Sequence, residues 1–255
     1  MNISKEKILK QKALHLRQKT FEMFIKKGEA HLGGSFSLIE TLIFLFNEKI
    51  RHNKDKFILS KSHASYPLCI LLNEKGLKTK MTTHLELDPR NGIYCTTGSL
   101  GHGLPIAAGM AFARKKKKLK GKIFVMISDG ECQEGTTWET LLIASKHQLD
   151  NLVILIDYNK IQALTKLEDG LPLNNLSSKV KSFNCNSITV KNAHSFNDLN
   201  KSFQKIKNNK KPSVLILNTI KGKGIKKFEN DPVWHARKLS AKDILIGRKD
   251  LKSKL

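Results

Sequence analysis

The sequence predicts an α/β fold, a doubly wound parallel sheet with helices on both faces. Residues 122–127 and 152–156 are short apolar runs typical of buried strands, and residues 136–147 between them have helical spacing. Strand, loop, helix and strand in this order form a βαβ unit, which implies a parallel sheet. There is no internal repeat and no linker-like stretch, so residues 1–255 are expected to form a single domain.

The N-terminal part is predicted to be largely helical before the sheet begins. Residues 5–27 place apolar side chains on one side of a helix, and a glycine follows as a plausible C-terminal end. A loop with a Gly-Gly pair covers residues 30–37, and a helix is predicted over residues 38–49. Residues 57–60 are the first clear core strand, which leads into a helix ending near Gly76.

The second half is predicted to complete the sheet. Residues 79–95 have loop character, and three closely spaced glycines then precede an apolar helix that runs to residue 113. No element is predicted for the polar stretch 163–187. The elements expected after it are a strand at 187–190, a helix at 195–207, the last core strand at 212–217, and a polar helical segment at 237–255 that faces a partner or solvent.

Composition limits the class of protein and the compartment. Hydrophobic residues make up 40% of the chain, which is enough for a full core, and no run of 18 apolar residues would form a membrane-spanning helix. The basic N-terminus is not followed by an apolar segment of the signal-peptide type. The four cysteines are scattered and form no CxxC pair, which favours reduced thiols and a cytoplasmic location.

The formal net charge of +24 raises the hypothesis of a nucleic-acid-binding protein. Only six of the 46 basic residues are arginines, and the lysines are spread along the whole chain. The one dense run, residues 114–118, ends a predicted helix, where cations interact favourably with the helix dipole. A solvated basic surface, an acidic partner chain or attraction for sugar phosphates explains the charge without nucleic acid.

Two oxygen-bearing side chains follow neighbouring strands of the predicted sheet. Asp129 comes directly after the first strand of the βαβ unit and Asn159 after the second, so both are expected at the carboxyl edge of the sheet. Ligands of α/β proteins bind at this edge. A carboxylate and an amide oxygen brought together there suit a magnesium ion that takes further ligands from a diphosphate and from water.

At this point the sequence resembles a known family. Asp129-Gly130, then roughly thirty residues, then Asn159 resembles the metal motif of thiamine diphosphate enzymes. The fuller pattern, DGE-x-x-EG-x-x-WE followed by LDNL and D-x-N-x-x-Q, is similar to the transketolase branch. Ser128 and Ser62 stand where the family usually has glycine. A serine is tolerable at such a position if the glycine serves close packing, and costs energy if it needs a positive φ.

Four further segments resemble the same branch, and a fifth does so more loosely. His31 lies in AHLGGSFS, His63 in ILSKSHA, and Trp234-His235 follows a T-x-KGKG segment; His84 matches the family's histidine more loosely. The segment TTGSLG-x-GL is close to the family's loop around the aminopyrimidine ring of the cofactor. The alternation of lysine and glycine in KGKG lacks the spacing of a phosphate-binding P-loop.

The resemblance implies a set of site residues. A metal ion, Mg²⁺ with Ca²⁺ or Mn²⁺ as substitutes, would be held by Asp129, Asn159 and the carbonyl of Ile161. Glu134 would reach across an interface to a glutamate of a partner. The residues implied as catalytic are His31, His63, His84, His235 and Glu134, and those implied to bind thiamine diphosphate are His63, Gly98, Ser99, Leu100, Asp129, Gly130, Glu134, Asn159, Ile161 and His235.

The resemblance also implies a partner chain, because the family places the catalytic glutamate on a pyrimidine-binding domain that this sequence lacks. A C-terminal transketolase subunit would supply that domain, in an assembly expected to be a dimer of heterodimers, with no nucleic acid and no membrane as partner. The implied reaction is transfer of a two-carbon ketol unit from a ketose phosphate to an aldose acceptor. Alternatives are a subunit similar to 1-deoxyxylulose 5-phosphate synthase or to a 2-oxoacid dehydrogenase or decarboxylase.

Overall fold

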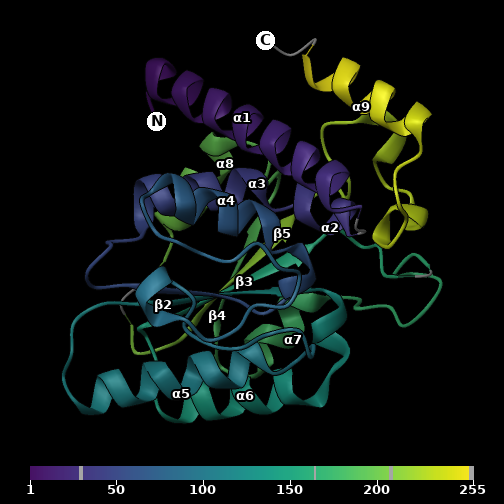
Figure 1. The fold of residues 1–255 in the computed structure, drawn as a ribbon. Helices are drawn as coiled ribbons and strands as arrows, with labels where there is room; N and C mark the ends of the chain where they lie inside the picture. The colour runs from purple at the N-terminus through teal and green to yellow at the C-terminus, as the bar shows by residue number, and fades with distance from the viewer. Residues whose placement is uncertain (29–30, 164, 207–208, 253–255) are drawn as a thin grey trace.

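A parallel five-stranded sheet forms the centre of the molecule (Figure 1). The computed structural model describes residues 1–28, 31–163, 165–206 and 209–252. The strands lie in the order β1-β2-β3-β5-β4, and every neighbouring pair is parallel. Their bounds are β1 (Lys56–Leu59), β2 (Ile123–Ser128), β3 (Leu152–Tyr158), β4 (Asn186–Val190) and β5 (Ser213–Asn218).

Helices cover both faces of this sheet, which confirms the predicted fold class. The chain moves in one direction across the sheet from β1 to β4 and turns back from β4 to β5, and right-handed crossovers then place helices on opposite faces. One face carries α1 (Ile3–Lys27), α3 (Ile39–Phe44), α4 (Tyr66–Glu74) and α8 (Phe196–Phe203), and the other carries α5 (Gly103–Lys116), α6 (Gly135–Lys146) and α7 (Leu176–Ser182) (Figure 1).

Two apolar clusters, one on each face, make up the core. In β2, Phe124 and Met126 belong to one cluster, whereas Ile123, Val125 and Ile127 belong to the other. This division follows from the alternation of side chains along a strand. Both sets must be apolar because both faces are covered, which explains the continuous apolar runs in the sequence.

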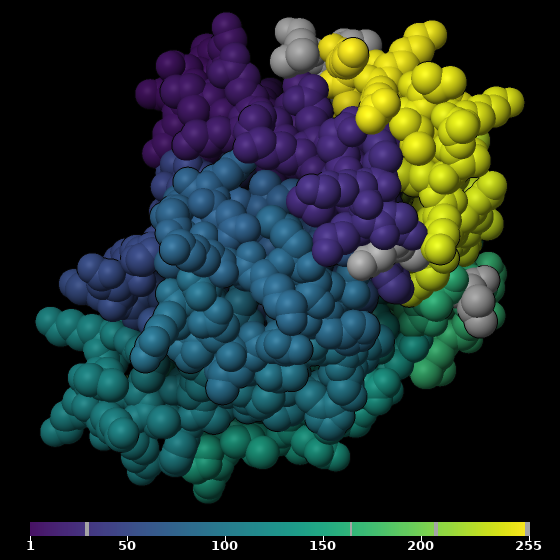
Figure 2. All heavy atoms as spheres, in the orientation of Figure 1, coloured from purple at the N-terminus to yellow at the C-terminus, as the bar shows by residue number. Residues whose placement is uncertain are grey.

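The two chain ends pack together at one side of the molecule. The C-terminal helix α9 (Ala241–Lys252) contacts α1, and Figure 2 shows the C-terminal residues in yellow against the N-terminal helix in purple. Gly247 lies in this contact, because a Cβ atom built on it would come 2.2 Å from the ring of Phe21. Within the described ranges, no helix is long and apolar enough to cross a bilayer.

Several predicted boundaries were wrong. A short helix, α2 (Leu32–Phe36), occupies most of the predicted loop over 30–37, of which Ala30 lies outside the described residues. The helix predicted over 38–49 is divided into α3 and a π-helical turn at Leu45–Lys49. Helix α7 lies in the polar stretch where none was predicted, since Leu176 and Val180 bury their side chains in the core. Helix α8 ends at Phe203, and residue 207, where its predicted end lay, is not described.

Candidate functional site

The segments that follow β1, β2, β3 and β5 meet around one cavity at the carboxyl edge of the sheet. Its volume is about 400 Å³. The side chains that line it come from six separate motifs of the sequence. They are Gly34, Lys61, His63, Leu100, Ser128, Asp129, Gly130, Gln133, Glu134, Asn159, Ile161, Gln162, Ala163, Thr165, Lys221 and His235.

The predicted metal ligands lie together beside this cavity. One carboxylate oxygen of Asp129 accepts the backbone N–H of Gly130 at 2.9 Å, and the other accepts that of Lys160 at 2.7 Å. Lys160 is the residue between Asn159 and Ile161, so the carboxylate touches the backbone that joins the other two predicted ligands. Burial and then the nearby charge of Asp157 raise the pKa of Asp129 to about 6. A cation next to this buried carboxyl group would stabilise its ionised form.

The buried carboxylate of Asp157 connects four of the loops through hydrogen bonds. Its carboxylate accepts the hydroxyl of Ser37 at 2.6 Å, the amide of Asn159 at 3.2 Å, and bonds from Lys61 and Thr219. Burial alone would raise its pKa, but the charge and the hydrogen bond of Lys61 outweigh burial and lower it. Asp157 therefore stays ionised and fixes the ammonium of Lys61 in the site.

A second buried ammonium, Lys221, faces the cavity from the segment after β5. Its Nζ atom donates at 3.0 Å to the carbonyls of Ile161 and Gln162 and lies 3.0 Å from Nδ1 of His235. Burial and the charge of Lys61 lower the pKa of Lys221 to about 8. Only 1% of each lysine is exposed. Because Lys61 is already paired with Asp157, Lys221 is the ammonium group of this cavity that suits a negatively charged ligand.

Three of the four predicted site histidines form a cluster. The ring centroids of His31, His63 and His235 lie 5.4–5.6 Å from one another. Burial and then the charge of Lys221 lower the pKa of His235 to about 3, and burial followed by Lys61 lowers the pKa of His63 well below its ordinary value. Both imidazoles are therefore neutral near pH 7, so each can donate one hydrogen bond and accept another.

The fourth histidine, His84, packs against the glycine-rich loop. Gly98 has φ 150°, and a Cβ atom on it would come 2.4 Å from the ring of His84. Any other residue would displace that ring, which accounts for glycine at this position. Leu100 lines the cavity, whereas His31, His84, Gly98 and Ser99 are outside the set of described residues that line it.

Glu134 and Glu131 play different structural parts at the start of α6. Glu134 lines the cavity and is exposed at its mouth. Glu131 is fully buried, and its carboxylate accepts the backbone N–H of Gly101 at 3.1 Å, that of Ser128 at 2.8 Å, and the hydroxyl of Ser60. Glu131 thus ties the glycine-rich loop to the carboxyl ends of β1 and β2.

Neither of the serines that replace family glycines requires a strained backbone. Ser128 is the last residue of β2, and neither it nor Ser62 is among the described residues with positive φ. The hydroxyl of Ser128 also accepts the backbone N–H of Glu131 at 3.2 Å. Since neither site needs a positive φ, the replacement costs no backbone strain.

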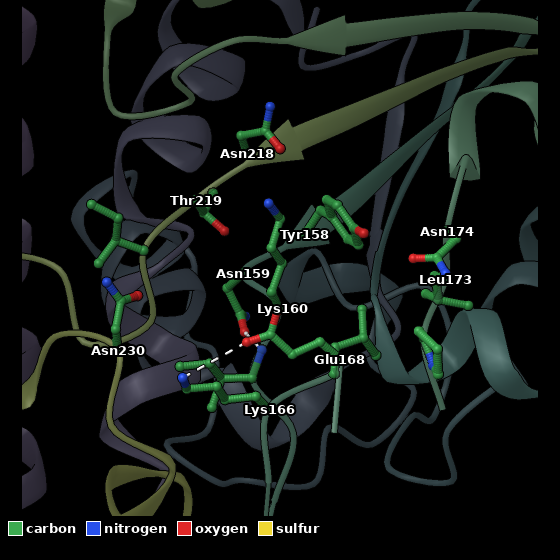
Figure 3. A pocket seen from close by; sticks show the side chains of 14 residues that line it. Tyr158, Asn159, Lys160, Lys166, Glu168, Leu173, Asn174, Asn218, Thr219 and Asn230 are labelled. Carbon is green, nitrogen blue, oxygen red and sulfur yellow. Dashed lines mark hydrogen bonds and ion pairs between the residues drawn. The ribbon is translucent and has the colours of Figure 1, made fainter. Parts of the chain in front are cut away.

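A larger cavity of about 610 Å³ lies beside the first one (Figure 3). Asn159 and Ile161 line both cavities and so form part of the wall between them. Figure 3 shows amide and hydroxyl side chains around the larger one, among them Asn174, Asn218 and Thr219. His63, His235 and the buried charges of Lys61, Asp129 and Lys221 line the smaller cavity, which we therefore take as the functional site.

Sequence reasoning assigned no role to several residues of the site. The motifs named above contain Lys61, Lys221, Asp157 and Glu131. Nothing in the sequence distinguishes a buried lysine from the many exposed ones. The available signal was position, because each of the four residues stands at or just after the carboxyl end of a core strand. That is the edge at which α/β proteins bind ligands.

Comparison with known proteins places this site in context. A family model described as the thiamine diphosphate binding domain of transketolase matches residues 9–254. A protein of Actinobacillus succinogenes that is named as a subunit of apulose-4-phosphate transketolase is 32% identical over 265 residues, which covers 96% of each chain. A 6-deoxy-6-sulfo-D-fructose transketolase subunit of a Clostridium species is 33% identical, over 92% of its length.

The chain is also similar to part of much longer transketolases. Human transketolase is 31% identical over 255 residues, but the chain covers only 40% of it. The crystal structure of the Campylobacter jejuni transketolase superposes with a TM-score of 0.87 at 25% identity, over 99% of this chain and 43% of that one. The chain thus spans less than half of these transketolases and nearly all of the relatives that are named as subunits.

Proposed function

The chain belongs to the transketolase family, in its thiamine diphosphate-binding domain, and we propose that it is the N-terminal subunit of a two-chain transketolase. The single observation that carries this proposal is the cavity in which six separate motifs meet around two buried ammonium groups, the oxygens of Asp129, Asn159 and Ile161, and the rings of His63 and His235. The relatives that match this chain almost end to end are named as transketolase subunits.

The residues present fit thiamine diphosphate and a divalent metal ion. The Asp129 carboxylate, the Asn159 amide oxygen and the Ile161 carbonyl are hard oxygen donors of the kind that Mg²⁺ prefers, with Ca²⁺ or Mn²⁺ as substitutes. Lys221 would balance part of the charge of the diphosphate, whereas the charge of Lys61 is already paired with Asp157. We assign the binding of the cofactor to His63, Gly98, Ser99, Leu100, Asp129, Gly130, Glu134, Asn159, Ile161 and His235.

The histidines are proposed to handle protons and sugar hydroxyls. Thiamine diphosphate, when bound, supplies the nucleophilic carbon for two-carbon transfer. His31, His63 and His235 would donate and accept hydrogen bonds at the hydroxyl groups of the sugar, with His84 beside the glycine-rich loop. The negative charge of a diphosphate would raise the low pKa values of His63 and His235 towards the working pH.

We propose that the partner subunit covers the α5–α6 face, by which we mean the exposed surface formed by Ile106, Gly109, Leu142 and Ile143. Ile106 is 41% exposed, Leu142 58% and Ile143 54%. Leu100 and Glu134 line the cavity and directly precede these two helices. A chain seated on this face would therefore also reach the mouth of the cavity, where Glu134 would meet the partner's glutamate.

The proposed reaction is ketol transfer from a ketose phosphate to an aldose acceptor. The two relatives named above act on different sugars according to their names. The donor of this enzyme therefore belongs either to a central or to a specialised sugar pathway. The four cysteines of the chain are unpaired and buried thiols, which suits a reducing cytoplasm. We propose a dimer of heterodimers as the assembly.

Calorimetry of cofactor binding tests this proposal. Thiamine diphosphate is titrated with Mg²⁺ into the chain alone and into its complex with a co-expressed C-terminal transketolase subunit. We expect tight binding with the partner present, and its loss in Asp129→Ala. The control Asp150→Ala, which changes a carboxylate at the opposite edge of the sheet, should bind as the wild type does. A wild-type complex that fails to bind the cofactor would contradict the proposal.

Product analysis then distinguishes the reaction types. The complex should convert a ketose phosphate and an aldose acceptor into a sugar that is longer by two carbons. Consumption of pyruvate as the donor would instead indicate an enzyme similar to 1-deoxyxylulose 5-phosphate synthase or to a 2-oxoacid dehydrogenase.

A further inference from the structure

A buried histidine outside the cavity, His194, holds the segment that carries Lys221. It lies between β4 and α8, and only 7% of its side chain is exposed. Its Nε2 atom accepts the backbone N–H of Ile220 at 2.8 Å, and its Nδ1 atom lies 2.9 Å from Glu40. Because Ile220 can only donate, Nε2 must carry no proton, and the proton on Nδ1 therefore faces Glu40.

Glu40 and Arg17 fix the orientation of that imidazole. Arg17 donates to the other carboxylate oxygen of Glu40 at 2.7 Å, and the side chains of both residues are at most 10% exposed. Burial would raise the pKa of Glu40, but the charge of Arg17 and the hydrogen bond of His194 outweigh it and lower the pKa to about 2. Glu40 therefore remains a carboxylate and keeps the tautomer of His194 in place.

The segment from Ile220 to Gly224 is held by several hydrogen bonds besides the one to His194. Gly222 donates its N–H to the carbonyl of Gly33 at 3.0 Å, and Asn230 donates to the carbonyl of Lys221 at 3.0 Å. The bond from Ile220 to His194 acts on the residue directly before Lys221. A shift at Ile220 would therefore move the start of the side chain that delivers an ammonium to the cavity.

We propose that His194 is a positioning residue, which acts through the backbone of Ile220 to hold the Lys221 ammonium where the cofactor's diphosphate binds. Arg17 and Glu40 complete the chain of contacts, which runs from α1 through α3 to the end of β5. This inference rests on the proposed function, because it assumes that the cavity binds thiamine diphosphate. His194 itself touches neither the cavity nor any residue assigned to the metal.

Two substitutions of His194 separate its two hydrogen bonds. In His194→Asn, the side-chain amide takes the place of Nδ1, so it can still bond Glu40 but cannot reach Ile220. In His194→Gln, the amide oxygen takes the place of Nε2 and can still accept the N–H of Ile220. We expect His194→Asn to weaken thiamine diphosphate binding by the complex about fivefold to thirtyfold, and His194→Gln to stay within about twofold of wild type.

A double-mutant cycle tests whether the effect passes through Lys221. In the Lys221→Met background, His194→Asn should add less than about a twofold change, because the ammonium that it positions is gone. The control His52→Asn changes an exposed histidine at the opposite edge of the sheet and should leave binding unchanged. Equal losses in the Asn and Gln variants, or a full loss on top of Lys221→Met, would overturn the inference.

Hydrogen exchange gives a readout that needs no cofactor. In the cofactor-free chain, the peptide that contains Ile220 should exchange faster in His194→Asn than in His194→Gln or wild type. If the exchange rate of this peptide is unchanged in His194→Asn, the hydrogen bond between Ile220 and His194 is refuted. If wild type fails to bind the cofactor, the proposed function fails; if wild type binds and His194→Asn binds equally well, only this inference fails.

Discussion

At the scale of single residues, buried charges define the site. Asp157 and Lys61 neutralise each other, whereas Asp129 accepts bonds from backbone N–H groups, and its pKa of about 6 reflects burial and a neighbouring carboxylate. In the folded chain without metal, Asp129 therefore takes up a proton more readily than in the unfolded chain. Its contribution to the free energy of unfolding is present at low pH and is lost as the pH rises through about 6.

A metal ion reverses this dependence, which yields a prediction for binding. Mg²⁺ needs the carboxylate form, so below pH 6 it must displace a proton from Asp129. We expect the apparent dissociation constant of Mg²⁺, measured by calorimetry at saturating thiamine diphosphate, to level off as the pH rises from 6 to 7. It should rise by up to about tenfold for each unit below pH 6.

The Asp129→Asn variant provides the control. It should bind the metal weakly at every pH, with the dependence near pH 6 removed. Wild-type binding that does not change between pH 5 and pH 7 would show that Asp129 is not the titrating ligand.

A second prediction concerns Glu131, which joins the glycine-rich loop to the sheet. In Glu131→Gln, one end of the amide carries an NH₂ group. Whichever way the amide turns, this NH₂ meets the N–H of Gly101 or that of Ser128, and neither can accept a hydrogen bond. We expect the free energy of unfolding in urea to fall by about 1–3 kcal/mol. The exposed Glu139→Gln in α6 should change it by less than about 0.5 kcal/mol, and equal effects of the two changes would refute the argument.

How far the sequence predicted the site depends on the kind of residue. Asp129, Asn159, Ile161, His63 and His235 were found through motifs, and the structure brings them to one cavity. Lys61 and Lys221 were missed because burial of a lysine depends on contacts such as Asp157 that are distant in sequence. His194 lies outside every motif, and its connection to Ile220 exists only in the folded chain.

At the scale of elements, the strands were predicted within one or two residues and the helix ends less well. Continuous apolar runs mark strands that are buried on both faces, so β2, β3 and β5 stood out. Helix α2 was missed because two of its five residues are glycines, which are weak helix formers. They are tolerated because the backbone lies close to other groups there: a Cβ atom on Gly33 would come 2.8 Å from the carbonyl of Trp234.

Two glycine-to-alanine changes test helix packing against helix propensity. Gly247 in α9 faces the buried ring of Phe21, so Gly247→Ala forces an overlap that we expect to destabilise the chain by about 1–3 kcal/mol. Gly109 in α5 has open space around it. Gly109→Ala should therefore stabilise the isolated chain by roughly 0.5–1 kcal/mol through helix propensity alone. Urea unfolding measures both, and a stabilising Gly247→Ala would mean that α9 does not pack on α1.

At the scale of the whole molecule, the exposed apolar side chains of the α5–α6 face lie next to basic ones. The chain carries a formal net charge of +24, and the lysines of α5 and α6 stand at the C-terminal ends of these helices, at Lys115, Lys116 and Lys146. Ile106, in the first turn of α5, and Leu142 and Ile143, one turn before Lys146 in α6, are exposed. A basic surface that repels a second copy of the same chain, around an exposed apolar patch, suits a partner of a different sequence.

Introducing negative charge on the α5–α6 face tests this arrangement directly. The double variant Leu142→Glu and Ile143→Glu should prevent co-purification with the C-terminal subunit, because two carboxylates would be buried without partners in the interface. The isolated chain should unfold at an unchanged urea concentration, since both side chains are already exposed. The matched control Leu245→Glu lies on α9, away from this face (Figure 1), and is 70% exposed; it should leave the complex intact. If the double variant still forms an active complex, the partner must cover another face, and Glu134 would then have to meet it from the opposite side of the cavity.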